Sequence, residues 1–302
     1  MEGVTPKEKI TLEKTNKFLK KIRPSFILVL IIILGVLVGN FIYVSIYNWY
    51  YDDGSNKSSV VGDSDNTSNS NCSVVGINLH GNLLTYIPAH SDNDPTFNYN
   101  SVASEDIVAK IKQADDDSNI KAIVLEVDSG GGSPIAGEEI SNAVKNSAKP
   151  VVGYIRETGA SSSYWAISSA TRIFASKNSN VGAIGITGSY LTNVSKNKKD
   201  GYEYQEIASG KYKDSGNPNK FMTNDEKAIF LRDVNIMYQN FMEAISQNRK
   251  IPIDKVKSFS DGSTVLGEKA KSLGLVDEIG GMNEIEKYLK DTTGENSEIC
   301  WK

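Results

Sequence analysis

Histidine and cysteine are both scarce in this chain of 302 residues, which contains two of each. The histidines, His80 and His90, fall early, in or beside predicted turns. A serine–histidine–aspartate triad therefore lacks a convincing base. No group of His, Cys and Asp residues has the ligand spacing of a metal site. We therefore expect neither a metal nor another cofactor.

An excess of positive charge is absent as well. Lys and Arg total 33 against 37 Asp and Glu, which gives a net charge of −4. Basic residues prevail only in residues 1–24, which carry seven basic and three acidic groups. The rest of the chain is acidic, whereas nucleic-acid phosphates are bound by Lys and Arg. We expect no nucleic-acid partner.

Residues 25–51 carry no charged side chain, and 26–46 form a predominantly apolar run of 21 residues, "FILVLIIILGVLVGNFIYVSI". As a helix, this run is long enough to span the roughly 30 Å of a bilayer core. A cleaved signal peptide is the alternative, but its apolar region would be shorter and followed by small residues. Here "YNWYY" follows, which is typical of a membrane interface. We expect an uncleaved transmembrane anchor over 25–51. The basic residues 1–24 then lie in the cytoplasm and the remainder outside the cell membrane.

Residues 52–73 are rich in Ser, Asn, Asp and Gly, so we interpret them as a flexible linker. We assign a globular domain to 74–293 and a C-terminal tail to 294–302. The two cysteines, Cys72 and Cys300, bracket the globular domain. Outside the membrane they could form a disulfide, and two unpaired thiols are the alternative.

Within the globular domain, short apolar strands alternate with amphipathic helices, which predicts an α/β fold. "SVVGINLHGNLLTY" (73–86) predicts a strand, a turn and a second strand. Helices are expected after Ser104 and after Ser133, each serving as the N-cap. A long helix is expected after Thr223, which opens a capping box with Glu226. Its apolar stripe predicts a core or subunit contact.

The glycine-rich motif "DSGGGS" (128–133) follows a predicted buried strand and precedes a helix. Backbone N–H groups at such a turn can stabilise an anion. No Gly-Lys-Ser/Thr follows, so the motif is not a P-loop, and it lacks the dinucleotide-binding spacing. A plain glycine turn is the alternative.

"TGASSSYW" (158–165) places three serines together after another predicted strand. A serine nucleophile needs a base, and without a suitable histidine a Ser–Lys pair is the candidate. "SGKYKDSGNP" (209–218) offers Lys211 and Lys213. A lysine can act as the general base near neutral pH only if its pKa falls from about 10.4 to about 7. Desolvation can cause such a fall. A facing carboxylate would oppose it, so Asp214 must point away from the catalytic lysine.

Together with "FASKNSNVGAIGI" and "DGSTVLGEKAKSLGLVDEIGG", these motifs occur in an order that resembles the signal peptide peptidase A family. These are membrane-anchored serine proteases of the ClpP/crotonase-like superfamily. The resemblance covers roughly residues 74–281 and implies repeated ββα units, here in a single-copy form. It implies that Ser161 is the nucleophile and Lys213 the general base. It also implies an oxyanion hole formed by the backbone N–H groups of Gly131 or Gly132 and of Ser162.

Several positions depart from the family pattern. Ser162 and Ser163 stand where the family usually has Gly-Gly after the nucleophile. Ala183 stands where the family commonly has a serine that orients the lysine, and Ser179 or Thr187 could take its place. Gly130 stands where the family usually has proline, which leaves the backbone donors present.

The resemblance implies a membrane-anchored serine endopeptidase that cleaves apolar peptides, such as remnant signal peptides, outside the cytoplasmic membrane. In this family the serine and lysine of one site come from different copies. A single-copy chain then implies a cyclic homo-oligomer that shares its sites. A catalytically impaired, membrane-tethered scaffold is the alternative, encouraged by Ala183. An acyl-CoA hydratase or isomerase of the same fold would need acidic bases and a nucleotide pocket that the sequence does not show.

Overall fold

The computed structural model describes Gly35 and residues 72–87, 100–294 and 298–302. The chain divides into two units, 1–68 and 69–302, and the helices and strands given below belong to the second. Apart from Gly35, the expected anchor lies outside the described residues, as do the linker up to residue 71 and His90. None of the helices within the described ranges has the length and apolar character needed to cross a membrane.

A parallel β-sheet forms the centre of the second unit, with strand order β2–β1–β3–β4–β5–β8. Off this path, β6 pairs with β4 and with the antiparallel β7, and β9 pairs with β1. The parallel pairing confirms the predicted α/β class. The strands are β1 (Val74–Leu84), β2 (Ser101–Ala103), β3 (Ala122–Gly132), β4 (Val151–Ala160), β5 (Arg172–Ala175), β6 (Asn180–Gly182), β7 (Thr264–Leu266), β8 (Glu278–Ile279) and β9 (Ile299–Trp301).

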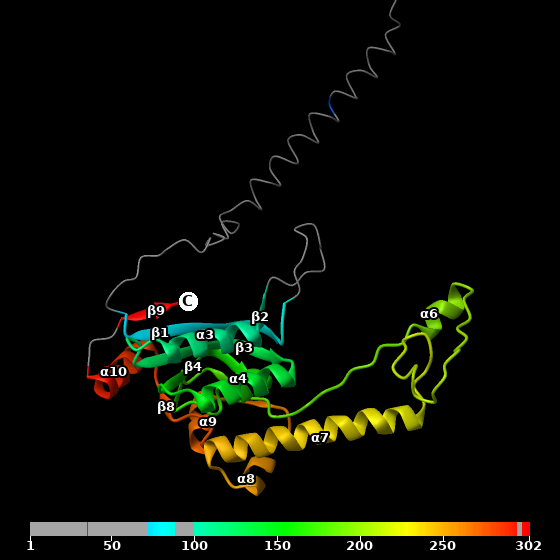
Figure 1. Ribbon diagram of the computed structural model, residues 1–302. Helices are drawn as coiled ribbons and strands as arrows, with labels where there is room; N and C mark the ends of the chain where they lie inside the picture. Colours follow the sequence, from blue (N-terminus) through cyan, green and yellow to red (C-terminus); the bar gives the residue numbers. More distant parts are fainter. Residues whose placement is uncertain (1–34, 36–71, 88–99, 295–297) are drawn as a thin grey trace, which may run out of the picture. The chain divides into compact units, whose positions relative to one another are not determined.

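Helices cover both faces of this sheet, and Figure 1 shows α3 and α4 along one of them. The larger core joins Leu125 of β3 to Ile107 of α3 and Ile140 of α4, and a smaller core joins Val124 to Ile285 of α10. Burial of near-continuous apolar runs on both faces is typical of parallel strands. The helices are α3 (Ser104–Asp116), α4 (Pro134–Asn146), α5 (Ser162–Ile167), α6 (Val194–Lys199), α7 (Asn224–Arg249), α8 (Ile253–Lys257), α9 (Gly267–Leu273) and α10 (Met282–Thr293).

Two of the three predicted helix caps are confirmed. The Ser133 side chain accepts a hydrogen bond from the backbone N–H of Ala136, and Thr223 forms a reciprocal capping box with Glu226 at α7. The prediction for Ser104 was wrong, because Ser104 is the first helical residue of α3. Its hydroxyl contacts the Thr85 carbonyl and the Glu139 carboxylate instead, so tertiary partners replace the local cap.

The predicted strand, turn and strand over 73–86 was also wrong, because β1 runs through this region as one strand. Its register against β3 shifts between His80 and Asn82. Gly81, at φ 79°, accommodates the irregularity in a backbone conformation that glycine adopts readily. The "HGN" sequence therefore marks a bulge and not a reversal of the chain.

The apolar stripe of α7 is buried only toward the end of the helix. Phe241 and Ile245 belong to the core, and the Phe241 ring stacks on that of Trp165 with centroids 4.8 Å apart. By contrast, Leu231 near the start of α7 is 54% exposed. The stripe therefore serves as core at one end and leaves apolar surface at the other.

A disulfide joins Cys72 to Cys300, whose Cα atoms lie 6.2 Å apart, so of the two alternatives that the sequence left open the bridged one is found. Cys300 belongs to β9, which lies within the expected C-terminal tail and pairs with the start of β1. The Trp301 side chain packs against Gly76, where an added Cβ would lie 2.4 Å from the ring. The disulfide and the strand pairing together attach the chain's end to the edge of the sheet.

Candidate active site

Ser161 occupies a sharp turn between β4 and α5. Its φ of 55° and ψ of −130° form a combination that non-glycine residues rarely adopt. The turn is held by two backbone hydrogen bonds: the Ser161 N–H donates to the Gly182 carbonyl at 2.7 Å, and the Trp165 N–H donates to the Ser161 carbonyl at 3.0 Å. A strained strand-to-helix turn of this kind is one way to expose a serine nucleophile.

The three consecutive serines differ in exposure. Ser161 is half-buried, whereas Ser162 and Ser163 are fully buried. The Ser163 hydroxyl accepts from the Ala160 N–H at 3.0 Å and lies 2.7 Å from the Ser129 carbonyl. The Ser162 hydroxyl is buried and has no hydrogen-bond partner among the residues described. Of the three hydroxyls, that of Ser161 is the one a substrate can reach.

The glycine-rich end of β3 lies directly beside this turn. An added Cβ on Gly131, whose φ is 99°, would lie 2.9 Å from the Ser161 Cβ and 3.0 Å from the Ser162 nitrogen. On Gly132 it would lie 2.1 Å from the Leu83 carbonyl oxygen. Both positions therefore require glycine. The structure brings the predicted nucleophile together with the predicted donors at 131 and 162.

Ser129 also orders this loop, although the sequence analysis did not single it out. Its hydroxyl donates to the Gly81 carbonyl at 2.6 Å and accepts from the Gly131 N–H at 3.1 Å. The bond from Ser129 to Gly81 depends on the bulge of β1 at Gly81. No local pattern in the sequence indicates this bond. The Gly131 N–H therefore already has a hydrogen-bond partner, the Ser129 hydroxyl.

Ser161 opens into a cleft of about 570 Å³. Apolar and aromatic side chains of the cleft come from the loop after β6, with Ile186, and from α7, with Val234 and Tyr238. The Tyr238 hydroxyl donates to the Ser260 carbonyl at 2.5 Å, which connects α7 to the segment 260–262 that also lines the cleft. The cleft thus combines a reachable hydroxyl with a mixed lining, in which Asn235 and Asp261 accompany the apolar side chains.

Ala183 lines the same cleft and has a φ of 48°, an unusual value for alanine. Its N–H donates to the Ser263 carbonyl at 2.9 Å, but it supplies no hydroxyl. Ser179 cannot replace that hydroxyl, because it is buried within 2.8 Å of the Arg156 carbonyl and accepts from the Ser176 N–H. Thr187 is exposed and lines the cleft, so its hydroxyl remains the candidate.

Residues 188–222, here called the lysine segment, contain both candidate bases. Lys213 is exposed and does not line the cleft at Ser161. Within the described part of the chain, its ammonium group forms no ion pair. Lys211, by contrast, pairs with Asp225 at 2.7 Å, and this hydrogen bond raises the Lys211 pKa, the wrong direction for a base. A single chain therefore brings the serine and the oxyanion donors together without Lys213.

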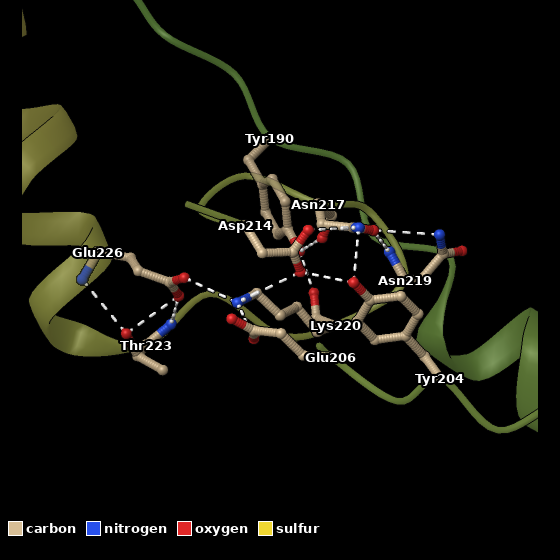
Figure 2. A network of polar contacts seen from close by, with 9 residues as sticks. All are labelled: Tyr190, Tyr204, Glu206, Asp214, Asn217, Asn219, Lys220, Thr223 and Glu226. Carbon is tan, nitrogen blue, oxygen red and sulfur yellow. Dashed lines mark hydrogen bonds and ion pairs between the residues drawn. The ribbon is translucent and has the colours of Figure 1, made fainter. Parts of the chain in front are cut away.

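Asp214 follows Lys213 in the chain, and its carboxylate has other partners (Figure 2). It accepts from the Tyr204 hydroxyl at 2.6 Å and from the Asn217 side-chain amide at 2.9 Å, and it lies 3.6 Å from the Lys220 ammonium. The hydrogen bonds from Tyr204 and Asn217 hold the pKa of Asp214 below its ordinary value. These contacts meet the requirement that Asp214 be directed elsewhere than toward the catalytic lysine.

Lys220 connects this cluster to the start of α7. Its ammonium lies 2.7 Å from Glu206 and 3.0 Å from Glu226, the capping residue of α7. The Tyr190 hydroxyl donates within the same network, where it contacts the backbone carbonyls of Asn217 and Lys220. The network was not predicted from the sequence because its members, apart from the Thr223–Glu226 capping box, are scattered over 190–226 and share no motif.

Comparison with known proteins identifies the family. The sequence model described as Peptidase family S49 matches residues 143–295. The protein belongs to peptidase family S49. The match includes Ser161 and Lys213. "Putative protease MJ0651" of Methanocaldococcus jannaschii is 36% identical over 176 residues, which cover 58% of this chain and 57% of that protein. "Protease 4" of Haemophilus influenzae is 31% identical over 241 residues, which cover 76% of this chain and 37% of that protein.

A further relative carries the name suggested by the motifs. "Putative signal peptide peptidase SppA" of Enterococcus faecium is 26% identical over 74% of this chain and 66% of its own length. These relatives confirm the resemblance to the signal peptide peptidase A family. The aligned part of this S49 protein spans about half or less of the length of the first two relatives.

Among solved structures, a ClpP1 mutant from Listeria monocytogenes matches with a TM-score of 0.46 and 15% identity. The match covers 70% of this chain and 93% of that chain. A likeness of this degree is too slight to assign an activity or an assembly.

Proposed function

We propose that this S49 protein is a membrane-anchored serine endopeptidase with Ser161 as nucleophile and Lys213 as general base. The observation that carries the proposal is the turn after β4. There, a reachable Ser161 hydroxyl adjoins the backbone of Gly131 and the N–H of Ser162 at the edge of a cleft. Serine proteases require this combination of a nucleophile and backbone donors for the developing oxyanion.

In the proposed reaction, the Ser161 hydroxyl attacks the scissile carbonyl while the neutral Lys213 amine accepts its proton. The Ser162 N–H and that of Gly131 or Gly132 donate to the resulting oxyanion. The lysine ammonium then protonates the leaving amine, and water hydrolyses the acyl-serine ester by the same route. Because the Gly131 N–H already donates to the Ser129 hydroxyl, it must give up this bond to serve as an oxyanion donor, and the N–H of Gly132 is the alternative.

Lys213 acts, in this proposal, on the serine of a neighbouring copy within a cyclic homo-oligomer. Its exposed position and its absence from the Ser161 cleft of its own chain support this arrangement. A repeated heterologous contact closes into a ring when the rotation permits. Such a contact would also desolvate the amine, which lowers the pKa of a lysine.

The proposed substrates are apolar peptides, such as remnant signal peptides, cleaved outside the cytoplasmic membrane. The apolar cleft walls at Ile186 and Val234 and the name of the Enterococcus relative support this substrate class. The uncharged run at 26–46 supports the location of the protein at the membrane. The absence of a hydroxyl at Ala183 favours one competing proposal, an impaired scaffold of the same fold.

A fluorophosphonate probe and a set of synthetic signal peptides test the proposal on the full-length protein. We expect the native protein to be labelled and to cleave the peptides. Ser161→Ala should lose labelling and at least about a thousandfold in cleavage, since it removes the nucleophile. Ser162→Ala, the matched control, should keep a substantial fraction, because only the backbone N–H at 162 is needed. A native protein that neither reacts nor cleaves would support the scaffold.

A further inference from the structure

The proposed mechanism places a base beside a residue that should impair it. Lys213 and Asp214 are adjacent in the chain, and a carboxylate close to a lysine stabilises its charged form and raises its pKa. Yet the ion pairs of the described residues include none between these two side chains, because the Asp214 carboxylate contacts Tyr204, Asn217 and Lys220. The partners of Asp214 therefore decide whether its carboxylate is free to pair with Lys213.

We propose that Tyr204 is a positioning residue for Lys213: its hydroxyl holds the Asp214 carboxylate in the network of Figure 2 and thereby prevents an ion pair between Asp214 and the Lys213 ammonium. The inference rests on the proposed Ser–Lys function and extends it to a residue that touches neither substrate nor Ser161.

Tyr204 is suited to this role because it supports both oxygens of the carboxylate. Its hydroxyl donates to Asp214 Oδ2 at 2.6 Å, a short distance typical of a bond to a charged acceptor. The same hydroxyl accepts from Asn217 Nδ2 at 3.0 Å, and Asn217 Nδ2 also contacts Asp214 Oδ1 at 2.9 Å. The bond raises the pKa of Tyr204, so the phenol keeps its proton at neutral pH and remains a donor.

The charges around Asp214 explain why Lys220 cannot hold it alone. Lys220 lies 2.7 Å from Glu206 and 3.0 Å from Glu226, but 3.6 Å from Asp214, so one cation faces three carboxylates. The other nearby cation with an ion pair, Lys211, is bound to Asp225. Tyr204 donates a hydrogen bond without adding a charge. If that donor is removed, Asp214 keeps the Asn217 amide and a share of the Lys220 ammonium, and we expect its freed oxygen to turn toward the adjacent Lys213 ammonium.

Tyr204→Phe in the full-length protein tests this role, because it removes the hydroxyl and keeps the ring. The titration of Lys213 is followed by NMR after reductive ¹³C-methylation, and its signal is assigned by its loss in Lys213→Arg. The pH profile of kcat/KM is recorded on unmethylated protein. We expect the Lys213 pKa and the acidic limb of the profile to rise by about one unit, as for a new neighbouring carboxylate. Cleavage near pH 7 should fall about tenfold and recover at higher pH.

Two further variants isolate the effect of the carboxylate. In Tyr204→Phe combined with Asp214→Asn, the Lys213 titration should return to its native position, because the carboxylate is gone. Tyr202→Phe is the matched control: this neighbouring side chain is 72% exposed, and its hydroxyl makes no hydrogen bond within the described part of the chain. It should change neither the titration nor the profile.

Two results would overturn the role of Tyr204. One is a loss of activity at every pH with an unchanged Lys213 titration, which would indicate a merely structural contribution. The other is a shifted titration that persists in the double variant. The proposed function fails separately, if Lys213→Ala cleaves peptides as well as the native protein. The NMR titration would still report whether Tyr204 keeps Asp214 from Lys213.

Discussion

The turn at Ser161 and the lysine segment differ in what fixes them. Around Ser161, the chain is held by backbone hydrogen bonds and a packed core, in which Tyr164 is fully buried and donates to the Leu275 carbonyl at 2.8 Å. The lysine segment is held by polar side chains at its base, as Figure 2 shows. It leaves large apolar side chains in solvent, with Ile207 98% and Leu191 85% exposed.

The two halves of the candidate site, the Ser161 turn and the lysine segment, therefore differ in whether they need a second copy of the chain. Close packing holds the nucleophile and its backbone donors in one arrangement within a single chain. The proposed base, Lys213, is exposed on the same segment as these apolar side chains, and exposed apolar groups are typical of an interaction site. We infer that the first half is complete in each chain and that the second is completed by contact with another copy.

The largest expected effect is the recovery of activity when two inactive variants are mixed, which tests whether the lysine segment acts on another copy. Ser161→Ala and Lys213→Ala are each expected to be inactive, because each removes one member of the catalytic pair. After subunit exchange in an equal mixture, about one site in four should join an intact serine to an intact lysine if neighbours share sites. Peptide cleavage by the mixture, relative to the native protein, measures the recovery.

The same mixture can disprove the sharing of sites. If subunits exchange, as shown by fluorescence transfer between labelled copies, and activity stays at zero, the serine and lysine of one site come from the same chain. Full activity of a stable native monomer at high dilution would lead to the same conclusion.

A methyl group at Gly131 should disrupt the turn at Ser161 and leave the lysine segment unchanged. In Gly131→Ala, the new Cβ would meet the Ala160 carbonyl and the Ser161 Cβ at 2.9 Å, at a φ of 99° that alanine disfavours. We expect at least about a hundredfold loss of kcat, as for removal of an oxyanion donor. Gly130→Ala is the control, because its Cβ would meet nothing within 4 Å. Equal activity of both variants would contradict a close fit at 131.

The sequence predicted the first region better than the second, for a physical reason. Strand propensity over 121–127 and the N-cap at Ser133 are local signals, and each is found in the element expected. The glycines at 130–132 were expected in a turn after that strand, but β3 continues through Gly132. Ser104 and the β1 bulge were misjudged because contacts distant in sequence decide them. The Tyr204–Asp214 bond joins residues on an irregular segment, where no periodicity restricts which side chains meet.

The smallest expected effect concerns the two helix caps, one in each region. The Thr223 backbone N–H, followed by Lys220, lowers the pKa of Glu226 to about 2. Because this pKa lies below its unfolded value of about 4.5, the cap stabilises α7 fully above that pH and is lost as pH falls toward 2.

Glu226→Gln should therefore reduce amide-exchange protection in the first turn of α7 by a few-fold at neutral pH. The difference from the native protein should shrink below pH about 4.5. The start of α4, capped by the Ser133 hydroxyl, which does not titrate, is the internal control. A difference at α7 that stays constant with pH would show that the Glu226 charge does not stabilise this helix.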